Sequence, residues 1–196
     1  MDRKETTKLL TDILIADRLS DRKYYAKEVT LDYGTDHPKR VDVMQFSPKG
    51  VVYPSDIEKG TFTCYEVKSC KEDIYSGNGI RFYGERNYFV MTTETFKEIQ
   101  DDINNGNLGR FIKEYYPESS KYYGFLVPVP KTIDLRDGDA LYAEYMNPTE
   151  FRGTPYDWHL TTAITCFEGT RTRSMAELLF CMLRSTHSYT NQRDFL

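Results

Sequence analysis

The stretch Gly60-Thr-Phe-Thr-Cys-Tyr-Glu-Val-Lys-Ser-Cys70 predicts a short strand around which the rest of the chain is arranged. Because side chains alternate across a strand, Cys64, Glu66 and Lys68 share one face and Tyr65 lies on the other. Strands rarely place a carboxylate and an ammonium at central positions. Two interpretations fit this pair: a solvated ion pair on an edge strand, or a site that carries chemistry.

The composition is that of an ordinary globular protein. Hydrophobic residues at 39% and charged residues at 29% exclude wholesale disorder, and 196 residues suit a single domain over 1–196. We find no export signal, no membrane-spanning run and no Cys/His metal spacing, which predicts a cytoplasmic protein with reduced thiols. The net charge of -4 is less basic than that of most nucleic-acid-binding proteins, although a bound divalent metal can offset acidic groups beside phosphate.

Hydrophobic periodicity divides the chain into alternating helices and strands. Helices are predicted at 6–19, 93–104 and 174–184, and strands at 26–33, 40–46, 60–70, 86–91 and 122–129. A long loop is expected at 47–59 and a variable segment, without a second domain, at about 131–160. This order predicts an α/β fold with a mixed central sheet flanked by helices.

Two elements carry more detailed expectations. Strand 40–46 is expected to alternate, with one face formed by Val41, Val43 and Gln45 and the other by Asp42, Met44 and Phe46. The closing helix is expected to bury Met175, Leu178, Leu179, Met182 and Leu183. Thr93 is a candidate cap for the middle helix, and Trp158 is expected to anchor packing beneath the variable segment.

Asp42 occurs in the strand immediately before the one that carries Glu66 and Lys68. If the two strands pair as a hairpin, the two carboxylates converge. Hard cations such as Mg²⁺ or Mn²⁺ take carboxylate oxygens together with waters and substrate phosphate, and the backbone carbonyl of Val67 adds a further candidate ligand. Such a metal lowers the pKa of water and neutralises phosphate charge, while Lys68 could position the water or stabilise the transition state.

Asp42 followed by Glu66-Val67-Lys68 resembles the motif of the PD-(D/E)XK nuclease superfamily. The wider sequence resembles the MmcB-like DNA-repair branch, and more closely its uncharacterised relatives in bacteriophages and mobile elements of Gram-positive bacteria. The resemblance covers roughly 6–129. It is carried by Lys27-Glu-Val-Thr-Leu31, Arg40-Val-Asp-Val43, Tyr65-Glu-Val-Lys-Ser-Cys-Lys-Glu-Asp-Ile74 and Asn87-Tyr-Phe-Val-Met91.

The resemblance implies a restriction-endonuclease-like αβββαβ core that binds Mg²⁺ or Mn²⁺ through Asp42 and Glu66. It also implies a catalytic role for Lys68, with Glu28 as an additional acid near the site. The sequence departs from the pattern in two places. Val41 replaces the proline that precedes Asp42, and the expected helix after Lys68 is broken by Gly77-Asn-Gly79, which is either a turn or a phosphate-facing loop.

These features predict a metal-dependent endonuclease that hydrolyses DNA, in DNA repair or in phage and mobile-element biology. The alternative is a non-catalytic relative that binds DNA or protein; a homodimer is compatible with either. Candidate phosphate contacts, for which solvated side chains are an equal alternative, are Lys71, Asn78, Arg81, Arg171 and Arg173.

Overall fold

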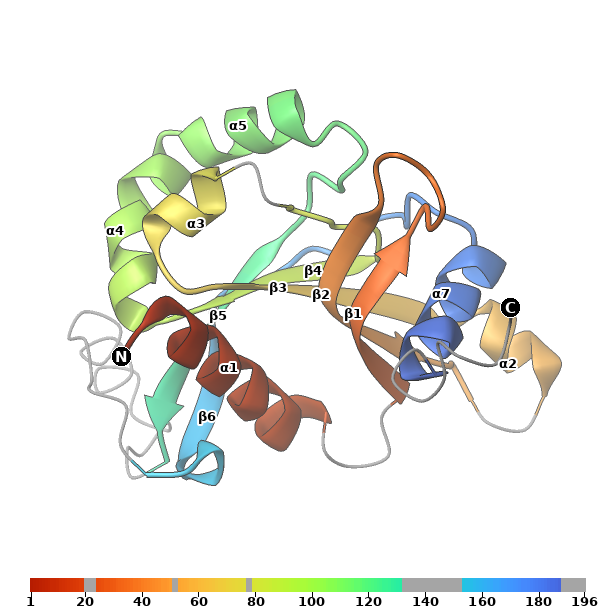
Figure 1. Cartoon of the computed structure of the whole chain (residues 1–196), viewed down its shortest axis with the longest axis horizontal. Coiled ribbons are helices and arrows are strands. Elements are labelled where there is room, and N and C mark those ends of the chain that lie inside the picture. Colours follow the sequence, from red (N-terminus) through yellow and green to blue (C-terminus); the bar gives the residue numbers. More distant parts are fainter. Residues whose placement is uncertain (20–23, 51–52, 77–78, 132–152, 188–196) are drawn as a thin grey trace.

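The computed structural model describes residues 1–19, 24–50, 53–76, 79–131 and 153–187, and in them a single six-stranded sheet forms the centre of the protein (Figure 1). The strands follow one another across the sheet in chain order. They are β1 (Tyr24–Leu31), β2 (Lys39–Ser47), β3 (Thr61–Lys68), β4 (Arg86–Met91), β5 (Gly124–Pro130) and β6 (Trp158–Ile164). Strands β3, β4 and β5 are mutually parallel, and the neighbouring pairs on either side of them are antiparallel.

The helices lie between and after these strands. They are α1 (Arg3–Leu14) with a π-helical turn (Ile15–Leu19), α2 (Pro54–Glu58), α3 (Lys71–Tyr75), α4 (Thr93–Asn104), α5 (Asn107–Tyr115), a 3-10 turn (Pro155–Asp157) and α7 (Met175–His187). The order α1, β1 to β3, α3, β4 follows the expected αβββαβ. The predicted α/β fold, a mixed sheet flanked by helices, is therefore confirmed.

Two apolar clusters cover opposite faces of the sheet. The α1-side cluster consists of Leu10, Ile13, Leu14, Leu19, Val43, Tyr65, Val67, Val90, Leu126, Trp158 and Leu160. The α7-side cluster joins α4, α5 and α7 to the other face and includes Met44, Phe46, Phe62, Cys64, Phe82, Phe89, Phe96, Ile112, Phe125, Leu178 and Met182. Trp158 packs in the α1-side cluster with 3% of its surface exposed, and its predicted place beneath the variable segment stays a prediction.

Strand β3 lies in the interior of the sheet, between antiparallel β2 and parallel β4. Every residue of β3 after Thr61 is buried. The interpretation of Glu66 and Lys68 as a solvated ion pair on an edge strand is therefore wrong. Both charges lie inside the fold, where water cannot solvate them.

The predicted alternation of β2 is wrong at Val41. Val41 packs in the α7-side cluster with Met44 and Phe46, although Val43 packs in the α1-side cluster. The break coincides with Glu28 on β1, which has a left-handed backbone with φ 51 and, between the paired positions on either side, faces Asp42. A left-handed residue interrupts the pleat, so the strands turn locally and Val41 changes face.

Some element ends and three whole elements differ from expectation. Thr92, not Thr93, caps α4 by accepting a hydrogen bond from the Thr95 amide at 3.1 Å. On α7 the predicted core residue Leu183 is 62% exposed, and Cys181 is buried instead. Helix α5 and strand β6 were not predicted, and the expected loop at 47–59 contains the short helix α2. Of the predicted variable segment, 132–152 lies outside the described residues. None of the described helices is long and apolar enough to cross a membrane.

The aromatic centre of the α7-side cluster gives a test of this packing. Phe89 is fully buried, and its ring centroid lies 5.3 Å from that of Phe125. We expect Phe89→Ala to lower the free energy of unfolding by about 3–5 kcal/mol, because it removes a buried ring and leaves a cavity. Urea denaturation measures this change. Phe167→Ala, which truncates a ring that is 76% exposed, is the matched control and should stay within about 0.5 kcal/mol of wild type. Equal destabilisation of both variants would contradict the packing described.

Candidate functional site

Glu66 and Lys68 are neighbours on one face of β3. Their side chains are 2% and 4% exposed, and the Lys68 Nζ lies 3.9 Å from Glu66 Oε2. The two residues share their strand face with Cys64, which belongs to the α7-side cluster. Their side chains therefore lie beside apolar side chains. A pair of charges in such surroundings is stable only when each charge has further polar partners.

The segment Gly79–Arg81 supplies those partners. Lys68 Nζ donates a hydrogen bond to the Gly79 carbonyl at 2.9 Å, and the Arg81 amide donates to Glu66 Oε1 at 3.1 Å. The Arg81 guanidinium lies over the ring of Tyr116, 5.0 Å from its centroid. Its Nε is buried without a hydrogen-bond partner among the described residues. This segment therefore covers the ion pair and places a third cationic group beside it.

Asp42 reaches the same region from β2. The paired positions of β2 and β3 end at Val43 and Tyr65, and continuing that register places Asp42 across from Glu66. Where backbone pairing ends, Asp42 Oδ2 accepts a hydrogen bond from the Val67 amide at 2.8 Å. The carboxylate thus takes the position of a backbone acceptor, and the structure brings Asp42, Glu66 and Lys68 together.

Burial and mutual charge control the two acids. Burial raises the pKa of Asp42, and the charge of Lys68 opposes that rise. Burial raises the pKa of Glu66 well above its ordinary value, the charge of Asp42 raises it further, and Lys68 again opposes. Two carboxyl groups that disfavour each other's ionisation form a site that a cation would stabilise.

The donor set for a metal is small. Among the described residues, no three His, Cys, Asp or Glu side chains come together in a way that could hold a metal ion. Asp42 and Glu66 therefore offer two carboxylates, which suits Mg²⁺ or Mn²⁺ because these ions fill their remaining positions with waters and phosphate oxygens. Val67 contributes its amide to Asp42; the predicted role of its carbonyl stays a prediction.

Asp42 also faces a cleft of about 810 Å³ that is lined by α1, by parts of β1 and β2, and by residues that follow β3. The cleft is lined by Arg3, Lys4, Thr7, Lys8, Thr11, Asp12, Lys27, Glu28, Arg40, Asp42, Ser69 and Asp73. Glu28, predicted as an additional acid, lies in this cleft, with its Oε1 3.9 Å from an Arg40 nitrogen. Sequence reasoning did not single out the cations on α1. Lys4 and Lys8 are four residues apart and so share one helix face, but that spacing does not show what the face lines.

Lys71 and Arg171 are engaged by carboxylates of the fold. Lys71 Nζ lies 2.9 Å from Asp102 Oδ2, and Arg171 forms an ion pair with Glu85. Glu85 in turn accepts a hydrogen bond from the Phe62 amide at 2.8 Å, so Arg171 supports the start of β3. Contact of these two cations with phosphate stays a prediction.

Arg173 joins three segments of the fold. Its guanidinium lies 3.1 Å from Asp32 and 3.1 Å from Glu118, and 5.4 Å from the centre of the Tyr83 ring. These contacts hold Arg173 in the loop before α7, and its contact with phosphate stays a prediction. Asn78, the remaining candidate for phosphate contact, lies outside the described residues.

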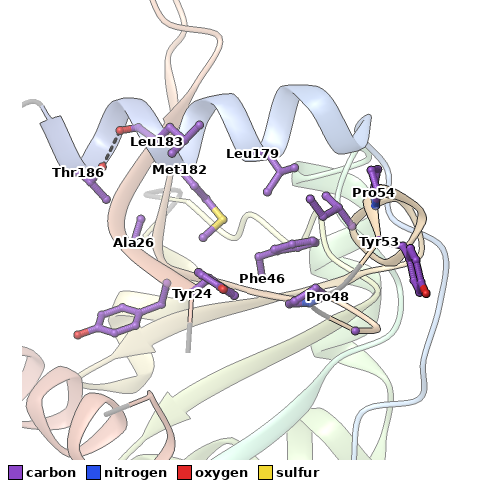
Figure 2. A pocket seen from close by; sticks show the side chains of 13 residues that line it. Tyr24, Ala26, Phe46, Pro48, Tyr53, Pro54, Leu179, Met182, Leu183 and Thr186 are labelled. Atoms are coloured by element: carbon purple, nitrogen blue, oxygen red, sulfur yellow. Dashed lines mark hydrogen bonds between the residues drawn. The ribbon is translucent and has the colours of Figure 1, made fainter. Parts of the chain in front are cut away.

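A second hollow of about 720 Å³ lies between α7, α2 and the adjoining parts of β1 and β2. Figure 2 shows Leu179 and Met182 reaching from α7 toward Phe46 on β2. Its lining is aromatic and aliphatic, with no acid, lysine, arginine, histidine or cysteine among the described residues. The chemistry-bearing side chains therefore gather at Asp42, away from this hollow.

Comparison of the chain with protein-family models, with curated proteins and with solved structures finds no match. What can be inferred about function comes from the residues of the site and from their geometry. The resemblance to PD-(D/E)XK nucleases stays a prediction.

The raised pKa of Glu66 predicts an unusual dependence of stability on pH. The unfolded carboxyl titrates near 4.5, whereas the buried one holds its proton to higher pH. As the pH rises above about 5, the unfolded state releases this proton first, so the free energy of unfolding falls until the folded group also titrates.

Glu66→Gln has no such proton. Between about pH 5 and pH 8, we expect its free energy of unfolding to fall less with rising pH than that of the wild type. Urea denaturation in EDTA measures both. Glu98→Gln, on an exposed part of α4, is the control and should follow the wild type. Parallel curves for wild type and Glu66→Gln would contradict the raised pKa.

Proposed function

We propose that this chain is a divalent-cation-dependent nuclease of the PD-(D/E)XK type that hydrolyses DNA phosphodiester bonds. The observation that supports it best is the meeting of Asp42, Glu66 and Lys68 from two paired strands beside a cation-lined cleft. The order of α1, β1 to β3, α3 and β4 adds support, because it is the order that the resemblance implies.

In this proposal Asp42 and Glu66 hold the cation. Burial raises the pKa of both carboxyl groups, so a cation bound there displaces their protons and binds more tightly as the pH rises. Bound there, Mg²⁺ or Mn²⁺ supplies Lewis acidity that acidifies water and neutralises phosphate charge. Lys68 holds the attacking water or stabilises the charge that develops on phosphorus-bound oxygens. Glu28 stands in the cleft, where it can accept a proton.

The proposal requires the segment Gly79–Arg81 to move, because it occupies the polar groups that a substrate would use. The Gly79 carbonyl accepts a hydrogen bond from the Lys68 ammonium, and the Arg81 amide donates one to Glu66. Gly79 has a left-handed backbone with φ +73, a conformation that glycine changes at little cost. A phosphate oxygen replacing the Gly79 carbonyl would keep the Lys68 ammonium hydrogen-bonded.

A second function has an observation in its favour. Glu66 and Lys68 are almost fully buried and their charges are satisfied within the fold, as expected for a structural ion pair. A protein that binds DNA or another protein without cutting would need nothing more from them. Such a binder would retain the cleft and lack metal-dependent cleavage.

Cleavage assays separate the two functions. We expect the protein to nick plasmid and cut single-stranded DNA with Mg²⁺ or Mn²⁺, and to be inactive in EDTA. Asp42→Asn, Glu66→Gln and Lys68→Met should each lower the rate by at least about a hundredfold, because each removes a group that acts on transition-state charge. Lys113→Met, which removes an exposed cation on α5, is the control and should stay near the wild-type rate.

Calorimetry completes the test. We expect Mn²⁺ to bind the wild type with release of protons, and Glu66→Gln to bind it more weakly. Cleavage that survives both Glu66→Gln and Lys68→Met would rule out this site. Absence of both Mn²⁺ binding and cleavage, with DNA binding retained, would establish the non-cleaving alternative.

A further inference from the structure

The cleft beside Asp42 has two cationic walls. One wall is the polar side of α1, where Lys4, Thr7, Lys8 and Thr11 follow one another at spacings of three and four residues and so share one face. The other wall carries Lys27 from β1 and Arg40 from β2. The same cleft is also lined by Asp12, Glu28, Asp42, Ser69 and Asp73.

The cations of these walls are held weakly or not at all by the fold. Lys4 and Lys27 form no ion pair among the described residues, and both are exposed. Lys8 pairs with Asp12 on the helix surface, and Arg40 approaches Glu28 only to 3.9 Å. Exposed pairs of this kind contribute little and exchange readily for a phosphate.

The amino-terminal end of α1 is already occupied. Asp2 caps the helix by accepting from the Glu5 amide at 2.8 Å, and the Glu5 carboxylate accepts in turn from the Asp2 amide. The positive end of the helix dipole is thus neutralised by the chain's own carboxylates. Attraction for an anion therefore comes from the lysine side chains along the helix, and this is consistent with a ligand that extends along the cleft.

From these observations we propose that the cleft binds the backbone of single-stranded DNA, with Lys4 and Lys8 on one side and Lys27 and Arg40 on the other. This inference rests on the proposed function and adds the strand type of the substrate. A volume of about 810 Å³ lies in the range of pockets that enclose a ligand of modest size, such as a short stretch of one strand. One strand laid between the walls brings its phosphates past Asp42.

The test measures binding without cleavage. A short fluorescent oligothymidylate is titrated with the full chain in EDTA, and anisotropy gives Kd at several salt concentrations. We expect Lys4→Glu/Lys8→Glu to weaken binding at least about tenfold near 0.1 M salt, and to reduce the slope of log Kd against log salt by about 0.7 for each phosphate that the protein no longer neutralises. The control variant Lys97→Glu/Lys113→Glu makes the same charge change on the exposed sides of α4 and α5. Its Kd should stay within about twofold of the wild-type Kd.

A second variant protects the test against misfolding of α1. Lys27→Glu changes the strand wall alone, and it too should weaken binding while the urea midpoint stays near that of the wild type. Equal Kd values for wild type, Lys4→Glu/Lys8→Glu and Lys27→Glu would overturn the proposal. So would tighter binding of the matching duplex or RNA than of the single strand, or no binding at all.

The two proposals fail in different ways. If Mn²⁺-dependent cleavage is seen and the cleft variants bind and cut as the wild type does, the cleft assignment is wrong and the nuclease stands. If the single strand binds through the cleft lysines but no metal-dependent cleavage occurs, the cleft assignment stands and the nuclease is wrong.

Discussion

The structure depends on the burial of an acidic and a basic side chain beside each other in its central strand. Glu66 and Lys68 occupy consecutive same-face positions of β3, where water is excluded and their polar partners include each other, the Gly79 carbonyl and the Arg81 amide. Because an uncompensated charge in such a place is strongly destabilising, the segment after α3 must come back over the strand. Fold and candidate chemistry are therefore coupled at one point, and a change there affects both.

Much of the architecture could be predicted from residue patterns. The strand 86–91 and the helix 93–104 occur with the expected bounds, since an apolar run and a capped amphipathic helix are strong local signals. Helix α5 was missed because it is short, contains Gly109 and is held by packing of Phe111 on Tyr75 and Tyr116. Strand β6 was missed because pairing with β5 defines it more than its own residues do.

The residues of the site could be predicted from the sequence, but the contacts around them could not. The spacing of Asp42, Glu66 and Lys68 placed them on neighbouring strands, and pairing in register brought them together. The Asp42 bond to the Val67 amide was not readable, because it depends on where two strands stop pairing. Nor was the role of α1, whose polar side forms a cleft wall only after its apolar side has docked on the sheet.

The docking of α7 has a consequence for how the chain is made. This helix, formed by 175–187, packs on β1, formed by 24–31, and supplies Leu178 and Met182 to the cluster that also contains Phe46 (Figure 1). A ribosome adds about 5–20 residues each second, so the first hairpin leaves the exit tunnel several seconds before its cover exists. During that interval its apolar face is exposed to solvent, and nascent chains on neighbouring ribosomes can aggregate through it. A chaperone that binds the hairpin until α7 has been translated would prevent this aggregation.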